Sequence, residues 1–130
     1  MPTVLIVDDD RNQRLLYQEE LSYEGYEVIE AASGQEAIAI VQDDGIDVVV
    51  LDIAMPGMDG VEALSRILAI DNKMPVVLNT AYSSYKDDFM TWAADAYVVK
   101  SSDLSGLKQQ IAEAVRKRGI EPPGVVADKS

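Results

Sequence analysis

The 130-residue sequence contains no cysteine and no histidine. The missing cysteines exclude a disulfide framework, a thiolate-held zinc ion, an iron–sulfur cluster and a cysteine nucleophile. The missing histidines exclude every catalytic device that pairs serine with histidine, and also a phosphohistidine formed on these residues. Any phosphohistidine chemistry must therefore come from a partner molecule.

Positive charge is also scarce, because 11 Lys and Arg stand against 23 Asp and Glu and give a net charge of −12. Binding to nucleic acid phosphates requires clustered Lys and Arg. The one basic run is Arg116-Lys117-Arg118. We therefore expect no direct contact with nucleic acid.

Long hydrophobic runs are lacking as well. The first apolar run, from Val4 to Val7, is too short for a signal sequence, and Met1-Pro2-Thr3 carries no charged segment before it. The sequence thus predicts no membrane association and a cytoplasmic location. With 48% hydrophobic but only 6% aromatic residues, the core must be built mainly from aliphatic side chains. One domain is the natural number for this length.

Apolar runs alternate with amphipathic helical patterns about five times. Strands are predicted at 3–7, 26–31, 47–51, 75–79 and 96–99. Helices are predicted between these strands: one that ends at Gly25, one that opens with the capping box Ser33-x-x-Glu36, one that begins at Asp59-x-x-Glu62, a weakly patterned one within 84–93, and a last one from Asp103 to Gly119.

This order predicts an α/β fold: a doubly wound parallel sheet of (βα)5 form with helices on both faces. Glu27 and Glu30 place the second strand at a sheet edge, where charge discourages pairing with another chain. The unalternating third strand fits a central position. The domain is expected to span 1–119, and residues 120–130, with Pro122 and Pro123, to form a flexible tail or linker stub.

Polar residues follow four of the predicted strands and should share one edge of a parallel sheet. They are Asp8 and Asp9, Asp52, Thr80 and Lys100. Three carboxylates in one crevice repel each other, so a hard cation is expected to neutralise them. Mg²⁺, or Mn²⁺ in its place, suits carboxylate and water ligands, whereas zinc would prefer the absent His and Cys. Taken alone, the run from Asp8 to Asp10 could equally cap the first helix.

Four motifs occur in order: Leu5-Ile6-Val7-Asp8-Asp9-Asp10, Asp52-Ile53-Ala54-Met55-Pro56-Gly57-Met58-Asp59-Gly60, Asn79-Thr80-Ala81 and Ala96-Tyr97-Val98-Val99-Lys100. In these motifs the chain resembles the receiver domain of bacterial two-component response regulators. The resemblance covers residues 3 to about 118. It implies the flavodoxin-like strand order 2-1-3-4-5.

The resemblance also implies a metal site. Asp9 would bind Mg²⁺ directly and Asp8 through a water molecule. Asp52 and the backbone carbonyl of Ala54 would complete the protein ligands.

A phosphoryl site and a switch are implied in the same way. Asp52 would be the phosphoacceptor, Lys100 would pair with the phosphoryl group, and Thr80 would donate its hydroxyl to it. Tyr97 would be the aromatic residue whose rotamer follows Thr80. The chain would catalyse only its own phosphorylation and dephosphorylation.

The implied partners are a sensor histidine kinase or a histidine phosphotransfer protein, and a downstream effector. The effector would read the surface formed by the helix within 84–93, the strand 96–99 and the last helix, and a homodimer is compatible with the resemblance. Two alternatives stay open. One is a phosphorylation-independent interaction module on the same fold. The other is a phosphatase with an aspartate nucleophile, which would need an acid where Ala54 stands.

One position departs from the family, since Ser101 follows Lys100 where receivers usually have proline. A cis peptide before a residue other than proline costs about 2.5–4 kcal/mol. The Lys100–Ser101 bond is therefore predicted to be trans.

Overall fold

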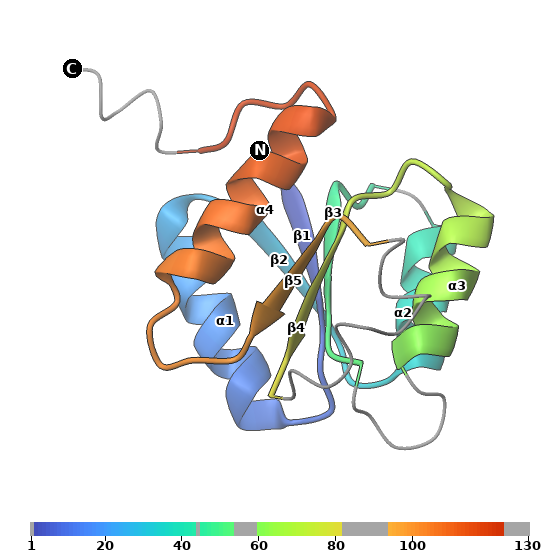
Figure 1. Cartoon of the computed structure of the whole chain (residues 1–130), viewed down its shortest axis with the longest axis horizontal. Helices are drawn as coiled ribbons and strands as arrows, with labels where there is room; N and C mark the ends of the chain where they lie inside the picture. The colour runs from blue at the N-terminus through green and yellow to red at the C-terminus, as the bar shows by residue number, and fades with distance from the viewer. Residues whose placement is uncertain (1, 44, 54–59, 82–93, 124–130) are drawn as a thin grey trace.

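The computed structural model of the chain describes residues 2–43, 45–53, 60–81 and 94–123 (Figure 1). Its five strands are β1 (Thr3–Val7), β2 (Glu27–Ala31), β3 (Val48–Leu51), β4 (Val76–Thr80) and β5 (Ala96–Val99). The helices of the described residues are α1 (Arg11–Glu24), α2 (Gly34–Gln42), α3 (Gly60–Ile70) and α4 (Ser105–Lys117). Strand boundaries differ from the sequence prediction by one residue at most.

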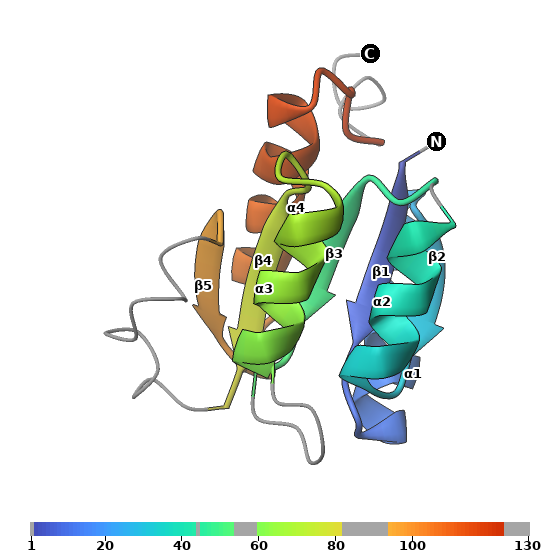
Figure 2. The same cartoon turned by 90° about the vertical axis from the view of Figure 1, so that its right-hand side faces the viewer.

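The strands form one parallel sheet in the order β2-β1-β3-β4-β5. This confirms the predicted α/β class, the strand order and the edge position of β2. The sheet separates two helical layers, with α1 and α4 over one face and α2 and α3 over the other (Figures 1 and 2). The predicted helix within 84–93 and the Asp59 end of the third predicted helix lie outside the described residues.

Each face of the sheet has its own aliphatic cluster. Residues at alternate positions of a strand point to opposite faces, so Leu5 and Val7 join the cluster under α2 and α3, whereas Val4 and Ile6 join the cluster under α1 and α4. Burial of both faces of the central strands explains their continuous apolar runs.

Local signals fix the helix ends as the sequence predicts. Gly25 ends α1 with φ of 106°, a left-handed conformation that a side chain disfavours. The Ser33 hydroxyl accepts a hydrogen bond from the Glu36 amide at 3.1 Å and so caps α2. The Glu36 carboxylate accepts one from the Ala32 amide at 2.9 Å, which completes the predicted capping box one residue earlier than its usual form.

The start of the predicted tail packs on the domain. Ile120 donates its amide hydrogen bond to the Val115 carbonyl and lies against the cluster under α1 and α4. Pro122 is buried, and Pro123 lies beside Gly25 at the end of α1. Residues 120–123 therefore pack against the domain, where their apolar members cover the ends of α1 and α4. None of the described helices is long and apolar enough to cross a lipid bilayer.

We predict that a chain truncated after Gly119 is less stable than one truncated after Pro123, by about 1–3 kcal/mol of unfolding free energy. The shorter chain loses the contacts of Ile120 and Pro122. Urea unfolding followed by circular dichroism measures the difference. Equal midpoints for the two chains would show that residues 120–123 contribute nothing to the packed body.

Candidate functional site

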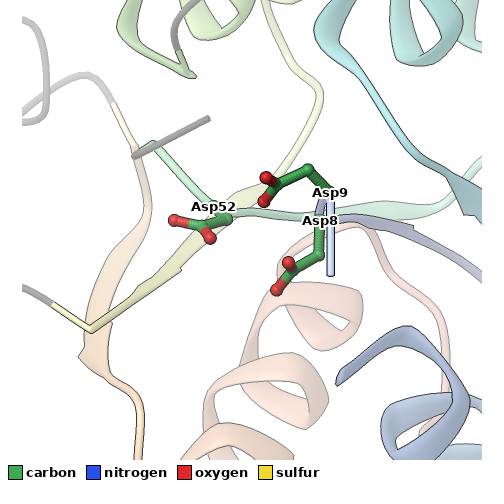
Figure 3. A group of neighbouring side chains, drawn as sticks. All are labelled: Asp8, Asp9 and Asp52. Carbon is green, nitrogen blue, oxygen red and sulfur yellow. The ribbon is translucent and has the colours of Figure 1, made fainter. Parts of the chain in front are cut away.

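The structure brings three carboxylates together at the C-terminal edge of the sheet (Figure 3). One oxygen from each of Asp8, Asp9 and Asp52 lies within 4.8 Å of the others. Asp8 and Asp52 are 2% and 5% exposed, whereas Asp9 is open to solvent. The cluster thus has two carboxylates on the protein side and one on the solvent side.

The backbone of the sheet fixes these positions. The Asp8 amide donates to the Ala31 carbonyl at 3.1 Å, and the Asp52 amide donates to the Val7 carbonyl at 3.0 Å. The first bond extends the hydrogen-bond ladder between β1 and β2 past the ends of these strands, and the second does the same for the ladder between β3 and β1. The side chains of Asp8 and Asp52 are held next to each other as a consequence, although the two residues are far apart in the sequence.

Lys100, which follows β5, lies between the two buried carboxylates. Its Nζ is 2.8 Å from Asp8 Oδ2 and 3.0 Å from Asp52 Oδ2. Its amide donates to the Thr80 carbonyl at 2.7 Å, so the end of β4 anchors the lysine backbone. Charge-assisted hydrogen bonds of this kind are stronger than neutral ones.

The pKa values follow from this arrangement. Burial raises the pKa of Asp8, and the hydrogen bond and charge of Lys100 offset only part of that effect. Burial by itself would lower the pKa of Lys100, but the hydrogen bonds and charges of Asp8 and Asp52 outweigh it and raise the pKa. The lysine is therefore firmly protonated and acts as the fixed positive charge of the site.

The donor set fits Mg²⁺. This ion is usually held by one or two carboxylates and keeps several water molecules, which the solvent-exposed side at Asp9 can admit. Asp8, Asp9 and Asp52 supply only hard oxygen ligands, which suit neither zinc nor copper. Ala54, the expected carbonyl ligand, lies outside the described residues.

The alternative in which the acidic run only caps the first helix holds for one of its three residues. The Asp10 carboxylate accepts from the amides of Asn12 and Gln13, at 2.9 and 3.4 Å, and is the N-cap of α1. The Asp8 carboxylate accepts from the Asp10 amide at 2.9 Å and also faces Lys100. Within this run Asp10 therefore caps α1, whereas Asp8 and Asp9 contribute their carboxylates to the cluster with Asp52.

Two residues that support the site were missed by the sequence reasoning. Arg14 of α1 donates to the Asp8 carbonyl at 2.7 Å and pairs with Glu30 of β2 at 3.2 Å, which clamps the end of β1. Gly60, the first residue of α3, packs directly on the backbone after β3. A Cβ there would lie 2.0 Å from the Ile53 Cα and 2.6 Å from the Asp52 carbonyl oxygen.

The predicted switch residues lie on neighbouring strands. Thr80 ends β4 and is completely buried, and Tyr97 of β5 is half-buried against the cluster under α2 and α3. Tyr97 pairs with Leu78, two residues before Thr80. Residues two apart on a strand point to the same face, so Thr80 and Tyr97 share one side of the sheet. No described peptide bond is cis, and the Lys100–Ser101 bond is trans as predicted.

Comparison with known proteins identifies the family. The family "Response regulator receiver domain" matches residues 4–112. The transcriptional regulatory protein PrrA of Mycobacterium tuberculosis is 37% identical over 120 residues, which cover 91% of this chain and 52% of PrrA. The sporulation initiation phosphotransferase F of Bacillus subtilis is 44% identical over 79 residues, 61% of this chain and 64% of that protein.

Solved structures of a response regulator have the same fold as this chain. The response regulator TrrA of Thermotoga maritima, crystallised in complex with Mg²⁺-BeF, superimposes with a TM-score of 0.85 at 42% identity, over 88% of this chain and 99% of that one. TrrA in complex with the histidine kinase ThkA gives a TM-score of 0.84 at 42% identity, with coverage of 88% and 99%. The chain belongs to the response regulator receiver domain family. It spans about half the length of curated relatives such as PrrA.

We predict that Lys100→Met increases the affinity for Mg²⁺ roughly tenfold or more, because the ion no longer competes with an ammonium group for Asp8 and Asp52. Isothermal titration calorimetry with Mg²⁺ alone measures this change. Lys108→Met, outside the site, is the control. Unchanged or weaker binding by Lys100→Met would contradict the electrostatic account.

The Mg²⁺ affinity of the wild-type chain should also fall with decreasing pH, starting at higher pH than for an exposed aspartate. The reason is that the pKa of Asp8 is raised, and protonation of Asp8 removes a ligand charge.

We predict that Gly60→Ala lowers the free energy of unfolding by about 2 kcal/mol or more, because the new methyl group meets backbone atoms that cannot rotate away. Mg²⁺ affinity should fall as well, since the displaced backbone carries Asp52. Gly106→Ala is the matched control, because a Cβ at that helical glycine meets nothing within 4 Å. Thermal unfolding and calorimetry compare the two variants, and similar stability of both would show that α3 yields to the methyl group.

Proposed function

We propose that the chain is a phosphoacceptor: Asp52 takes a phosphoryl group from a phosphohistidine of a partner protein in a Mg²⁺-dependent reaction. The observation that carries this proposal is the Lys100 ammonium held between Asp8 and Asp52, beside the exposed Asp9. A nucleophilic carboxylate, a cation site and a second fixed positive charge are the parts that phosphoryl transfer requires.

The reaction would proceed by a single displacement. A carboxylate oxygen of Asp52 bonds to phosphorus while the phosphorus–nitrogen bond to the partner's imidazole breaks, and the imidazole nitrogen keeps the electron pair. The product is an acyl phosphate on Asp52. Bound Mg²⁺ would neutralise charge on the phosphoryl oxygens, held by Asp8, Asp9 and Asp52, with the carbonyl of Ala54 as a further ligand.

Lys100 would change partners during this reaction. In the structure its ammonium neutralises both Asp8 and Asp52. Once Asp52 carries the phosphoryl group, new anionic oxygens become available to the ammonium, and Thr80 would donate its hydroxyl to another of them. The chain would catalyse its own phosphorylation and dephosphorylation, with no other substrate turned over.

The switch would follow from the movement of Thr80. Drawing Thr80 toward the phosphoryl group would free space for Tyr97, which lies on the same side of the sheet. The surface that includes β5 and α4 would then change and be read by an effector domain or protein. To operate such a switch, the phosphoryl group must stabilise one state over the other by a few kcal/mol. This is about the contribution of several charge-assisted hydrogen bonds.

A histidine kinase or a histidine phosphotransfer protein is the proposed donor. The chain has no histidine of its own, and the kinase complex of TrrA supports a partner of this type. A phosphorylation-independent interaction module is the second candidate on this fold. The complete set of acidic residues and Lys100 disfavours it, because buried carboxylates are costly and an interaction surface does not require them.

We predict that a phosphoramidate donor with Mg²⁺ adds one phosphoryl group to the wild-type chain and none to Asp52→Asn. The amide keeps the shape of the side chain but removes the nucleophile. Intact-mass spectrometry measures the adduct, and EDTA should abolish it in the wild type. Asp10→Asn is the matched control, since asparagine also caps a helix well, and it should be labelled like the wild type. An adduct that persists on Asp52→Asn, or forms equally in EDTA, would refute the assignment.

A further inference from the structure

An arginine–glutamate pair lies beside the acidic cluster, at the end of β1. Arg14 of α1 donates through Nη1 to the Asp8 carbonyl at 2.7 Å, and its Nε lies 3.2 Å from Glu30 Oε1. The Arg14 side chain is only 15% exposed, whereas the side chain of Glu30, on the edge strand β2, is 39% exposed. A guanidinium group that meets two acceptors in this way is held in one orientation, because its N–H groups form a rigid planar fork.

Arg14 takes over where the ladder between β1 and β2 ends. The Asp8 amide donates to the carbonyl of Ala31, the last residue of β2. The next amide of the chain, that of Ala32, donates to the Glu36 carboxylate of the capping box. Asp8 is 2% exposed, and a buried carbonyl without a donor is costly. The guanidinium of Arg14 supplies this donor from α1.

The bonded carbonyl belongs to the peptide that joins two of the three site carboxylates. Consecutive strand residues direct their side chains to opposite faces, yet oxygens of Asp8 and Asp9 lie within 4.8 Å of each other. The chain bends at Asp9, and the two carboxylates leave it in different directions (Figure 3). The direction of the Asp8–Asp9 peptide therefore sets the spacing of the two carboxylates, and Arg14 holds that peptide by its oxygen.

Asp9 depends on this peptide more than Asp8 does. The Asp8 carboxylate is held separately, by Lys100 Nζ at 2.8 Å and by the Asp10 amide at 2.9 Å. Asp9 is exposed, and among the described residues no hydrogen bond or ion pair holds its carboxylate. The backbone therefore has to place the Asp9 carboxylate beside the other two.

We propose that Arg14, held in place by Glu30, is a positioning residue for the metal site: it fixes the Asp8–Asp9 peptide so that both carboxylates face one Mg²⁺ ion together with Asp52. The inference rests on the Mg²⁺-dependent function proposed above. In this role Arg14 acts on the backbone and is not itself a ligand. Loss of Arg14 should therefore weaken Mg²⁺ binding, although it removes a positive charge from the neighbourhood of the site.

The sign of the effect separates positioning from simple electrostatics. A cation site gains affinity when a neighbouring positive charge is removed. Arg14→Met removes such a charge and leaves Glu30 without its partner, so charge alone predicts tighter Mg²⁺ binding. We expect the opposite result, an affinity about 3- to 10-fold lower by isothermal titration calorimetry with Mg²⁺ alone, which corresponds to the loss of one hydrogen bond. Unchanged or tighter binding would overturn the proposal.

Arg118→Met is the matched control. Arg118 makes the same kinds of contact at the opposite end of the strands, before β4 begins: its Nη1 donates to the Lys73 carbonyl at 3.2 Å and lies 3.4 Å from Asp71 Oδ2. Both variants should lose thermal stability, because each lacks an arginine that bridges a carboxylate and a backbone carbonyl. Only Arg14→Met should lose Mg²⁺ affinity. Equal Mg²⁺ affinities of the two variants would show that Arg14 only stabilises the fold.

Two milder variants serve if Arg14→Met folds poorly. Arg14→Lys keeps the charge but replaces the planar fork with a single ammonium group, so its Mg²⁺ affinity should lie between those of the wild type and Arg14→Met. Glu30→Gln should also weaken Mg²⁺ binding, but by less than about twofold when Arg14 is already Met, since Glu30 acts through Arg14. Wild-type affinity in both Arg14→Lys and Glu30→Gln would overturn the proposal. Losses that add in the double variant would overturn the role given to Glu30.

Labelling by phosphoramidate distinguishes this inference from the function on which it rests. The Mg²⁺ concentration that gives half the maximal rate should rise in Arg14→Met. The rate at saturating Mg²⁺ should approach the wild-type value, because Asp52, Lys100 and Thr80 are intact. A lower rate at saturating Mg²⁺ with an unchanged Mg²⁺ requirement would contradict the metal-site role. A wild-type chain that binds Mg²⁺ more tightly than Arg14→Met but is not labelled would refute the phosphoacceptor function and support the positioning role.

Discussion

Neutralisation of buried carboxylate charge is the constraint on which the site depends. Two aspartates sit almost completely inside the protein at the ends of β1 and β3, where ionised groups are costly without a partner. In the structure Lys100 supplies the partner charge to both Asp8 and Asp52. The same two carboxylates are the proposed ligands of Mg²⁺, so the lysine and the ion would compete for them until a phosphoryl group brought new negative charge. One side chain can in this way stabilise both the resting and the phosphorylated site.

The parallel sheet makes this competition geometrically possible. Its strand ends lie side by side, and hydrogen bonds that continue beyond the strands hold Asp8 beside Asp52. Supporting contacts come from the layers around the edge: Arg14 fixes the Asp8 carbonyl from α1, and Gly60 lets α3 approach the backbone that follows β3. The site is therefore formed by the whole sheet edge. The helical layer of α1 supports the end of β1, and the layer of α3 packs on the backbone that follows β3.

Much of this arrangement is predictable from the sequence because the signals are local or periodic. Apolar runs predict the strands, and the two glutamates of β2 predict that this strand lies at an edge of the sheet. Gly25 predicts the end of the first helix and Ser33 the start of the second. Residues that follow parallel strands, such as Asp52 and Lys100, can be brought together by topology alone. The supporting residues were not predictable in the same way. Arg14 is one of several charged residues of α1, and the need for glycine at position 60 appears only when the α3 backbone is seen against that of Ile53. The packing of Ile120 also depends on a helix neighbour that no local pattern reveals.

The most direct test of the account is a crystal structure of this chain with Mg²⁺ and beryllofluoride, which mimics a phosphoryl group on an aspartate. The account predicts beryllium bonded to an oxygen of Asp52, Mg²⁺ held among Asp8, Asp9 and Asp52, and Lys100 moved from Asp8 to a fluorine atom. Beryllofluoride bound elsewhere, or a Lys100 ammonium that still bridges Asp8 and Asp52 in the complex, would contradict it.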